Sequence, residues 1–268
     1  MVRGMGRIHL GTSGYVYKHW KNLLYPPKLP ARRWLPYFAQ VFSTVELNGT
    51  FYCLPSAETV DSWREQVPEG FRFACKGSRF LTHMKRLTDV GLGLERFFEV
   101  VLRLGPKLGP VLWQLPPHMK KPDPERLDNF LCHLPHHLQH VFEFRDAAWY
   151  HPEVLEVLDA WGAAVCEHDL LPEPPPFVTG GFRYLRFHGT ASKYSGLYGK
   201  EGLRPVARDL EGWRRAGHTA WVYFNNDLQG HALLDAFDLA ELLGDPLPPR
   251  PPLEGEAEFE ARSVGGIG

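Results

Sequence analysis

Short apolar runs alternate with longer amphipathic segments along the whole chain. Eight of these runs have the length and the β-branched or aromatic content that are typical of strands. They span residues 8–11, 44–48, 71–76, 111–115, 141–145, 163–167, 183–188 and 220–225. Because each run is followed by turn or loop residues, the pattern predicts eight short, separate strands.

Apolar side chains at helical spacing occupy most of the intervals between these strands. Trp34, Phe38 and Val41 share one helical face after the first strand. Ser56 and Asp123 stand where the N-cap residues of two later helices are expected. Further helices are predicted to begin at Pro152 and to cover 206–216 and 231–243, the last two ending at Gly217 and Gly244.

The alternation of strands and helices predicts a parallel sheet that is covered by helices. Eight repeats and a final helix favour a single closed (β/α)₈ barrel of the TIM type, and an open doubly wound sheet is the alternative. The sixth repeat is irregular, because the segment between Glu167 and Phe182 is rich in Pro and is predicted to lack its helix. We expect a barrel domain over 1–244 and a disordered or loosely docked tail over 245–268.

Composition excludes several classes of protein. The 268 residues carry a formal net charge of −1, so the chain has no global basic field for nucleic acid or for a membrane surface. No segment is long and apolar enough to span a bilayer, and the first residues lack the apolar core of a signal peptide. The four cysteines form no C-x-x-C pair. We therefore expect a cytoplasmic protein.

Charged and polar side chains interrupt the predicted strands near their C-terminal ends. Glu143 and Arg145 are two residues apart, so they share one face of their strand. The same arrangement on other strands adds Glu46, Asn48, Lys76, Gln114, Arg186, His188 and Asn225. Since the C-terminal ends of barrel strands form the functional face, we predict one polar site at this mouth. The alternative is a salt-bridge network of Glu143, Arg186 and Lys76 that plugs the barrel.

Several motifs occur together in this chain. They are Gly11-Thr-Ser-Gly14, Thr44-Val-Glu-Leu-Asn48 with Thr50-Phe-Tyr52, Trp113-Gln-Leu-Pro-Pro117, Glu143-Phe-Arg145 with Trp149, Tyr184-Leu-Arg-Phe-His-Gly189 and Tyr223-Phe-Asn-Asn226. With this combination, over about 8–243, the chain resembles the domain of unknown function 72 family, also called YecE-like. The resemblance implies a TIM-type barrel related in shape to metal-dependent sugar isomerases and apurinic-site endonucleases. It implies no established reaction.

The polar mouth predicts an enzyme that acts on a small anionic substrate, bearing phosphate or carboxylate, by acid–base chemistry. The candidate catalytic residues are Glu143, His188, Lys76 and Glu46. The candidate substrate-binding residues are Asn48, Tyr52, Gln114, Arg145, Trp149, Arg186, Tyr198, Asn225 and Asn226. Among these, Arg186 and Asn225, with His188, form the preferred anion site. The glycine-rich loop 189–203 is expected to close over the ligand.

Other functions stay open as alternatives. A metal-dependent endonuclease or isomerase would need several converging ligands, but Lys76, Arg145 and Arg186 would repel a cation there. A glycosidase is less favoured, because Gln114 stands where such barrels carry an acid. A non-catalytic nucleic-acid-binding module would use the basic, aromatic stretch 15–33. We predict no cofactor, and a divalent metal is kept as an alternative; no membrane partner is expected.

Overall fold

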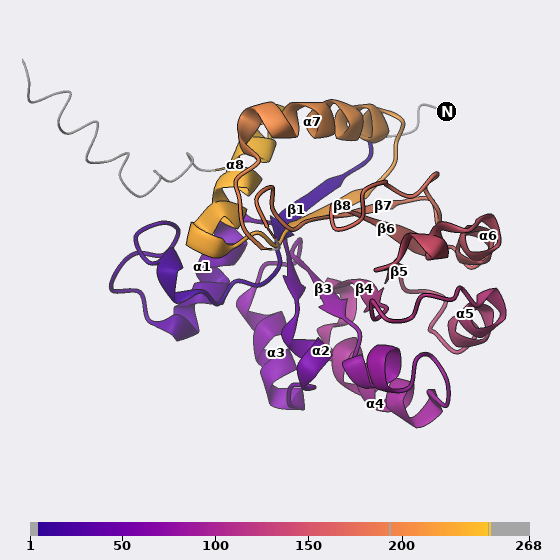
Figure 1. Ribbon diagram of the computed structural model, residues 1–268. Helices are drawn as coiled ribbons and strands as arrows, with labels where there is room; N and C mark the ends of the chain where they lie inside the picture. Colours follow the sequence, from indigo (N-terminus) through magenta and orange to yellow (C-terminus); the bar gives the residue numbers. More distant parts are fainter. Residues whose placement is uncertain (1–4, 193, 246, 248–268) are drawn as a thin grey trace, which may run out of the picture.

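An eight-stranded parallel sheet, rolled into a nearly closed barrel, forms the centre of the computed structural model (Figure 1). The structure describes residues 5–192, 194–245 and 247. The strands are β1 (Ile8–Thr12), β2 (Thr44–Leu47), β3 (Arg72–Lys76), β4 (Leu108–Gln114), β5 (His140–Glu143), β6 (Ala164–His168), β7 (Arg183–Phe187) and β8 (Ala220–Phe224). Their order in the sheet is β1-β8-β7-β6-β5-β4-β3-β2. The predicted (β/α)₈ barrel is confirmed, although β4 begins at Leu108 rather than at residue 111.

Helices surround the barrel and cover the outer face of its strands (Figure 1). They are α1 (Trp34–Val41), α2 (Gly49–Tyr52), α3 (Ala57–Gln66), α4 (Gly91–Val101), α5 (Pro124–Leu131), α6 (Pro152–Ala160), α7 (Gly199–Arg215) and α8 (His231–Leu243). Short 3₁₀ segments lie at Lys18–Trp20, Ala31–Arg33, Leu102–Lys107, Ala147–Tyr150 and Leu228–Gly230, and a π-helical turn at Phe80–Met84.

The predicted helix caps form as their residue types require. The Ser56 hydroxyl accepts a hydrogen bond from the Thr59 N–H at 3.3 Å, and the Asp123 carboxylate accepts one from the Arg126 N–H at 3.0 Å. Gly244 ends α8 in the left-handed region, with φ of 71°, which costs a glycine little. Local sequence therefore determines where these helices begin and end.

The helix predicted over 206–216 begins earlier, at Gly199. Pro205 lies inside α7. A proline has no backbone N–H and normally argues against a helix at its position, so the predicted helix began after Pro205. The Asp235 carboxylate on α8 accepts hydrogen bonds from the Tyr198 and Gly199 N–H groups at 3.0 and 2.8 Å. A side chain from another helix thus caps the first turn of α7. The residues near Gly199 in the sequence could not predict this cap.

The sixth repeat lacks a helix, as predicted. Residues 169–182, all described, run from β6 to β7 without any helical turn. The Thr179 hydroxyl accepts a hydrogen bond from the Val165 N–H and donates one to the Ala163 carbonyl, both at 2.8 Å. These bonds tie the irregular segment to β6 and satisfy backbone groups that a helix does not cover.

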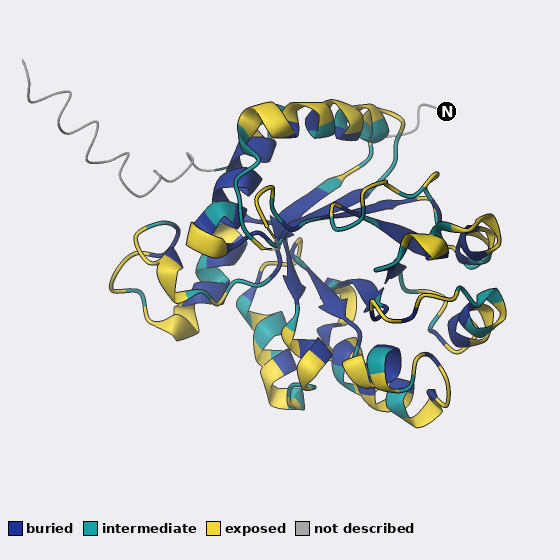
Figure 2. Ribbon diagram, viewed as in Figure 1, coloured by how far each residue is buried: buried dark blue, intermediate teal, exposed yellow. Residues whose placement is uncertain are grey.

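The strands of the barrel are mostly buried, whereas exposed residues gather on the surrounding helices and loops (Figure 2). Alternation along the strands separates two apolar regions. The larger one packs the helices against the outside of the barrel and contains Phe38, Trp113 and Phe130. The smaller one fills the barrel interior and consists of Ala74, Leu112, Val141, Ala164, Cys166, Phe182, Tyr184, Trp221 and Tyr223. Because this interior is packed with side chains, the chemistry has to lie above it, at the C-terminal ends of the strands.

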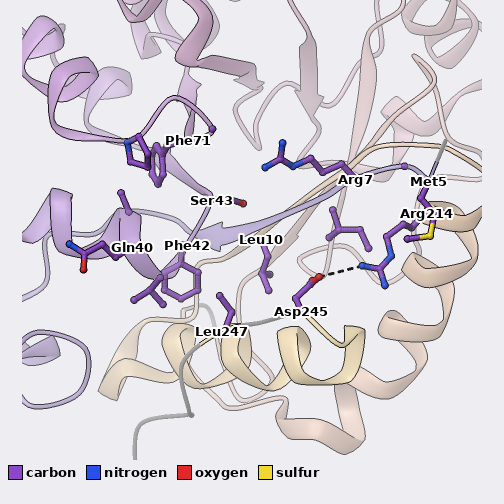
Figure 3. Close-up of a pocket in the computed structure, with 16 residues that line it drawn as sticks. Met5, Arg7, Leu10, Gln40, Phe42, Ser43, Phe71, Arg214, Asp245 and Leu247 are labelled. Atoms are coloured by element: carbon purple, nitrogen blue, oxygen red, sulfur yellow. Dashed lines mark hydrogen bonds and ion pairs between the residues drawn. The ribbon is translucent and has the colours of Figure 1, made fainter.

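The barrel is least complete between β1 and β2. Only a bridge between Ser13 and Glu46 joins these two edges within the described residues, with the Gly14 N–H donating to the Glu46 carbonyl at 2.9 Å. At the N-terminal ends of the strands a cavity of about 530 Å³ lies beside this seam, and Arg214 contacts Asp245 at 3.3 Å along its wall (Figure 3). The cavity is at the opposite end from the predicted site. Apart from Asp245 and Leu247, the predicted tail 245–268 lies outside the described residues.

Replacing Asp235 by Ala should lower the free energy of unfolding by about 1–3 kcal/mol, because the Tyr198 and Gly199 N–H groups and the Asn226 amide would lose their buried acceptor. Asp123→Ala serves as the control. It removes a cap that is more exposed than Asp235, and this should lower the free energy of unfolding by about 1 kcal/mol. Urea denaturation would measure both values. An equal loss in the two variants would contradict the buried cap.

Candidate functional site

The guanidinium of Arg186 links three strands across the barrel. Arg186, on β7, donates from Nη2 to Glu46 Oε1 on β2 at 2.7 Å and from Nη1 to Glu143 Oε2 on β5. Both carboxylates are fully buried, and Arg186 is only 1% exposed. The guanidinium of Arg186 therefore contacts two carboxylates in a place where all three charged groups are shielded from water.

Further donors keep the two carboxylates ionised. Ser13 and Tyr184 donate their hydroxyls to the Glu46 carboxylate at 2.6 and 2.7 Å. Burial raises the pKa of Glu46, but Arg186 and the other donors and cations lower it more, so the net shift is downward. Burial likewise raises the pKa of Glu143, and its neighbouring arginines bring it well below its ordinary value. Both groups are anions at neutral pH and poor proton donors there.

Arg145 extends this network toward the edge of the barrel. Its Nε forms an ion pair with Glu143 Oε1, and its Nη2 donates to Gln114 Oε1 at 3.2 Å. The same Gln114 oxygen accepts a second hydrogen bond, at 2.6 Å, from the ammonium of Lys76. A continuous polar chain thus runs from Arg186 through Glu143, Arg145 and Gln114 to Lys76, and it crosses β7, β5, β4 and β3.

His188 is held beside this network as a neutral imidazole. Its Nε2 lies 3.2 Å from Nη1 of Arg186, which can only donate, so Nε2 accepts and the ring proton is on Nδ1. Nδ1 then donates to Asp169 Oδ1 at 3.0 Å. Burial lowers the pKa of His188 to about 4, helped by Arg186 and opposed by Asp169. Tyr198 donates its hydroxyl to the other Asp169 oxygen.

A pocket of about 430 Å³ opens at the mouth, on the β2, β3 and β8 side. Its lining residues are Tyr17, His19, Asn48, Tyr52, Lys76, Tyr194, Asn225, Asp227 and Leu228. Among the predicted site residues, Asn48, Tyr52, Lys76 and Asn225 are in this lining. The four predicted residues Glu46, Glu143, Arg186 and His188 are outside it, in the buried network.

Lys76 is the cation of this pocket and has an unusual environment. It is 9% exposed, and its Nζ lies 4.6 Å from the centre of the Phe51 ring. Burial and the charges of Arg186 and Arg145 lower its pKa to about 8, although Glu143 and Glu46 act in the opposite direction. Its amine therefore changes protonation close to neutral pH.

Asp227, three residues beyond β8, lines the same pocket and was missed by the sequence analysis. Burial raises its pKa to about 6, although the Trp20 indole N–H, which donates to it at 2.7 Å, and His19, 2.8 Å away, lower it. The sequence offered one indication of this position: Asp227 directly follows Asn225 and Asn226, which were predicted to lie at the mouth. The alternation of side chains between the two faces ends with the strand, so residue spacing could not place Asp227 in the site.

The remaining predicted residues lie in supporting positions. Trp149 is buried, donates to the Met119 carbonyl at 2.6 Å and stacks on Phe144. Asn226 is buried and donates to Asp235 at 2.7 Å. Tyr198 is bound to Asp169 as described, so the loop that begins at Gly189 is anchored to the His188 pair.

The described part of the chain shows no group of three or more His, Cys, Asp or Glu side chains that could hold a metal ion. Glu46 and Glu143, the two fully buried carboxylates at the mouth, both form ion pairs with Arg186. No described helix has the length and apolar character needed to cross a membrane.

Replacing Arg186 by Met should lower the free energy of unfolding at neutral pH by about 3–5 kcal/mol, because the buried Glu46 would lose its ion-pair partner and Glu143 would keep only Arg145. In the wild type the lowered pKa values make these groups stabilising above about pH 4.3, and this is lost as the pH falls through the folded-state values. In the variant, Arg186 would no longer offset the burial of Glu46, so the pKa of Glu46 should rise and stability should fall as the pH rises from about 5 to about 8.

Denaturant unfolding of the Arg186→Met variant across this pH range would measure the effect. The matched control carries Glu46→Gln as well, which removes the unpaired buried charge, leaves the Arg145–Glu143 ion pair in place and should restore part of the stability. A loss that does not depend on pH would contradict the electrostatic role.

Comparison with known proteins identifies the family. The model of the family described as "Protein of unknown function DUF72" matches residues 9–256. UPF0759 protein YunF of Bacillus subtilis (strain 168) is 25% identical over 270 residues, covering 88% of this chain and 94% of YunF. UPF0759 protein YecE of Escherichia coli (strain K12) is 32% identical over 113 residues, 42% of each chain.

A solved structure supports the same assignment. The crystal structure of a DUF72 family protein, TM1631, from Thermotoga maritima MSB8 superposes with a TM-score of 0.77 and 28% identity, over 89% of this chain and 99% of the other. That of EF0366 from Enterococcus faecalis V583 gives 0.74 at 20% identity, over 92% and 98%, which shows the fold alone. The expected family resemblance is confirmed: the chain belongs to the DUF72 family of proteins of unknown function.

Proposed function

We propose that this barrel is an enzyme that performs acid–base chemistry on a small anionic, polar substrate bound in the pocket at its mouth. One observation carries the proposal: Lys76 and Asp227 line the same pocket, and burial moves their pKa values toward neutrality from opposite sides, to about 8 and about 6. Such a pair supplies an acid and a base at the same pH.

Positive charge near Lys76 supports an anionic substrate. Burial lowers the pKa of His83 to about 4, and the basic groups that add to this shift are Lys76, Arg79, His118 and Arg145. These groups come from β3, β4 and β5 or from the loops that follow them, so one side of the mouth is cationic. An anion placed here is attracted without any contact to the buried Arg186.

Polar groups at the pocket also favour a substrate with hydroxyl or N–H donors. Asn48 has a buried Oδ1 atom without a hydrogen-bond partner among the described residues. A buried acceptor of this kind costs free energy until a donor meets it. Asn225 stands after β8 in the same lining and offers a second amide.

The buried network has a positioning role in this proposal. Glu46, Glu143 and His188, predicted as catalytic residues, surround Arg186, and the network holds Gln114 and through it Lys76. Between about pH 6 and 8 Asp227 is ionised and accepts a proton, whereas Lys76 is protonated and donates one. No cofactor is part of this proposal.

Binding of inorganic phosphate, pyruvate and ribose 5-phosphate, followed by thermal unfolding at about pH 7, tests the anionic pocket. At least one probe should stabilise the wild type, by about 2.7 kcal/mol at a hundredfold excess over its Kd. Lys76→Met should abolish this stabilisation, whereas Lys200→Met, which removes a surface ion pair with Glu241, should keep it. Unchanged stabilisation in Lys76→Met would refute the proposed site.

The affinity for the same probe should fall as the pH rises. Ionisation of Asp227 near pH 6 adds a negative charge to the pocket, and deprotonation of Lys76 near pH 8 removes its positive charge. Calorimetric titration from about pH 5 to about pH 9 would measure both steps, and Asp227→Asn should remove the lower one. A profile that is flat for the wild type contradicts both assignments.

A further inference from the structure

We propose, building on the function above, that the Lys76 amine is a nucleophile that forms an imine with an aldehyde or ketone bearing an anionic group. The proposal rests on where the amine lies: it faces the pocket and makes a hydrogen bond to a neutral amide oxygen, beside two arginines that are already paired. The substrate class then becomes an anionic carbonyl compound such as a keto acid or an aldehyde phosphate.

A second buried lysine shows what distinguishes Lys76. Lys107 is 5% exposed, and its ammonium donates to the carbonyls of Arg64 and Val67, both at 2.8 Å, and lies 3.1 Å from Glu69. Lys76 is similarly buried, but within the described residues it has no carboxylate within ion-pairing distance, and Gln114 Oε1 is its hydrogen-bond acceptor. Lys107 therefore has a carboxylate partner, whereas Lys76 can lose its proton without breaking an ion pair.

Burial favours the neutral amine, which is the reactive form, and Arg186 and Arg145 add to this effect. With a pKa of about 8, roughly a tenth of the Lys76 amine is neutral at pH 7. An ordinary lysine with a pKa of about 10.4 has about 4 neutral amines in 10,000 at that pH. The Phe51 ring, 4.6 Å from Nζ, favours the ammonium form through a cation–π contact, so burial and the two arginines lower the pKa in spite of this contact.

The covalent step balances with groups already in the pocket. The nitrogen lone pair attacks the carbonyl carbon, the C=O π electrons move to oxygen, and that oxygen takes up a proton while nitrogen loses one. The resulting hydroxyl is protonated and leaves as water, as the nitrogen lone pair forms the C=N bond. The net change is amine plus carbonyl to imine plus water, and no oxidant or reductant is needed.

Two neighbours fit the protonated imine. It keeps one N–H, which can continue to donate to Gln114 Oε1. Asp227, in the same lining, supplies a carboxyl group that gives and takes the protons of the two steps. An iminium also withdraws electrons from the adjacent carbon, so the same carboxylate could then remove a proton there, as isomerase and lyase chemistry requires.

Reductive trapping tests the imine directly. The full-length protein is incubated with limiting glyoxylate at about pH 7, reduced with borohydride, and mapped by peptide mass spectrometry. We expect one reduced adduct on Lys76, at least about tenfold more abundant than on any other lysine. The trapping rate should rise with pH to a midpoint near 8. Lys76→Arg should lose the adduct, and Lys200→Arg should keep it.

Each outcome has a consequence. Labelling spread over the exposed lysines, or unchanged by Lys76→Arg in protein with a wild-type circular dichroism spectrum, overturns the imine. Equal trapping of propionaldehyde, which has no anionic group, overturns the anionic substrate class. If phosphate or pyruvate stabilises the wild type through Lys76 but nothing is trapped, the imine fails and the acid–base proposal stands. If neither stabilisation by the anionic probes nor a trapped adduct depends on Lys76, both the acid–base proposal and the imine are overturned.

Discussion

The ion pairs of Arg186 are the constraint on which the mouth of this barrel depends. Glu46 and Glu143 come from strands on different sides of the barrel, and both are fully buried. Without a counter-ion each would be costly in such a place. A guanidinium suits this position, because it offers several donors in a fixed plane and stays protonated, which a lysine does not do reliably when it is buried. The contacts therefore set both the charge and the geometry of the mouth.

The paired carboxylates also explain why the groups with pKa values near neutrality lie elsewhere. Glu46 and Glu143 are held as anions by arginine, and His188 is held neutral by burial and by Arg186, so none of them changes protonation near pH 7. The two pocket groups are less fully compensated. Lys76 has a neutral acceptor, and the Trp20 indole and His19 offset the burial of Asp227 only in part. Incomplete compensation is what moves their pKa values toward neutrality.

Much of this arrangement follows from strand alternation. The sequence places Glu46 and Asn48 on one face of β2 and its extension, and the structure agrees that they stand at the same mouth. However, residues two apart differ in depth by about 6.6 Å. Glu46 consequently lies in the buried network, whereas Asn48 lines the pocket. Residue spacing predicts which face of the strand a side chain occupies. How deep the side chain lies in the barrel depends on the stagger of all eight strands, and the sequence of one strand does not determine that stagger.

Contacts between distant segments limited the prediction in the same way. Asp227 and Trp20 are separated by 207 positions, and Asp235 caps α7 from α8. For Asp227 the local sequence showed only a carboxylate in a loop, and for α7 it showed a proline inside the helix. In neither case could the distant partner be predicted from the sequence. Caps made by near neighbours, such as Ser56 and Asp123, were predicted correctly because donor and acceptor are three residues apart.

The arginines and the lysine at the mouth differ in how they are paired. Arg145 and Arg186 are permanently charged and are bound to carboxylates, so their field acts on the pocket without their leaving the network. Burial lowers the pKa of Lys76, and this field adds to the effect. In the proposed function the same field would attract an anionic substrate. A bound anion would oppose the lowering of the pKa, because its charge favours the ammonium form. Under that proposal, substrate binding and the protonation of Lys76 would be coupled.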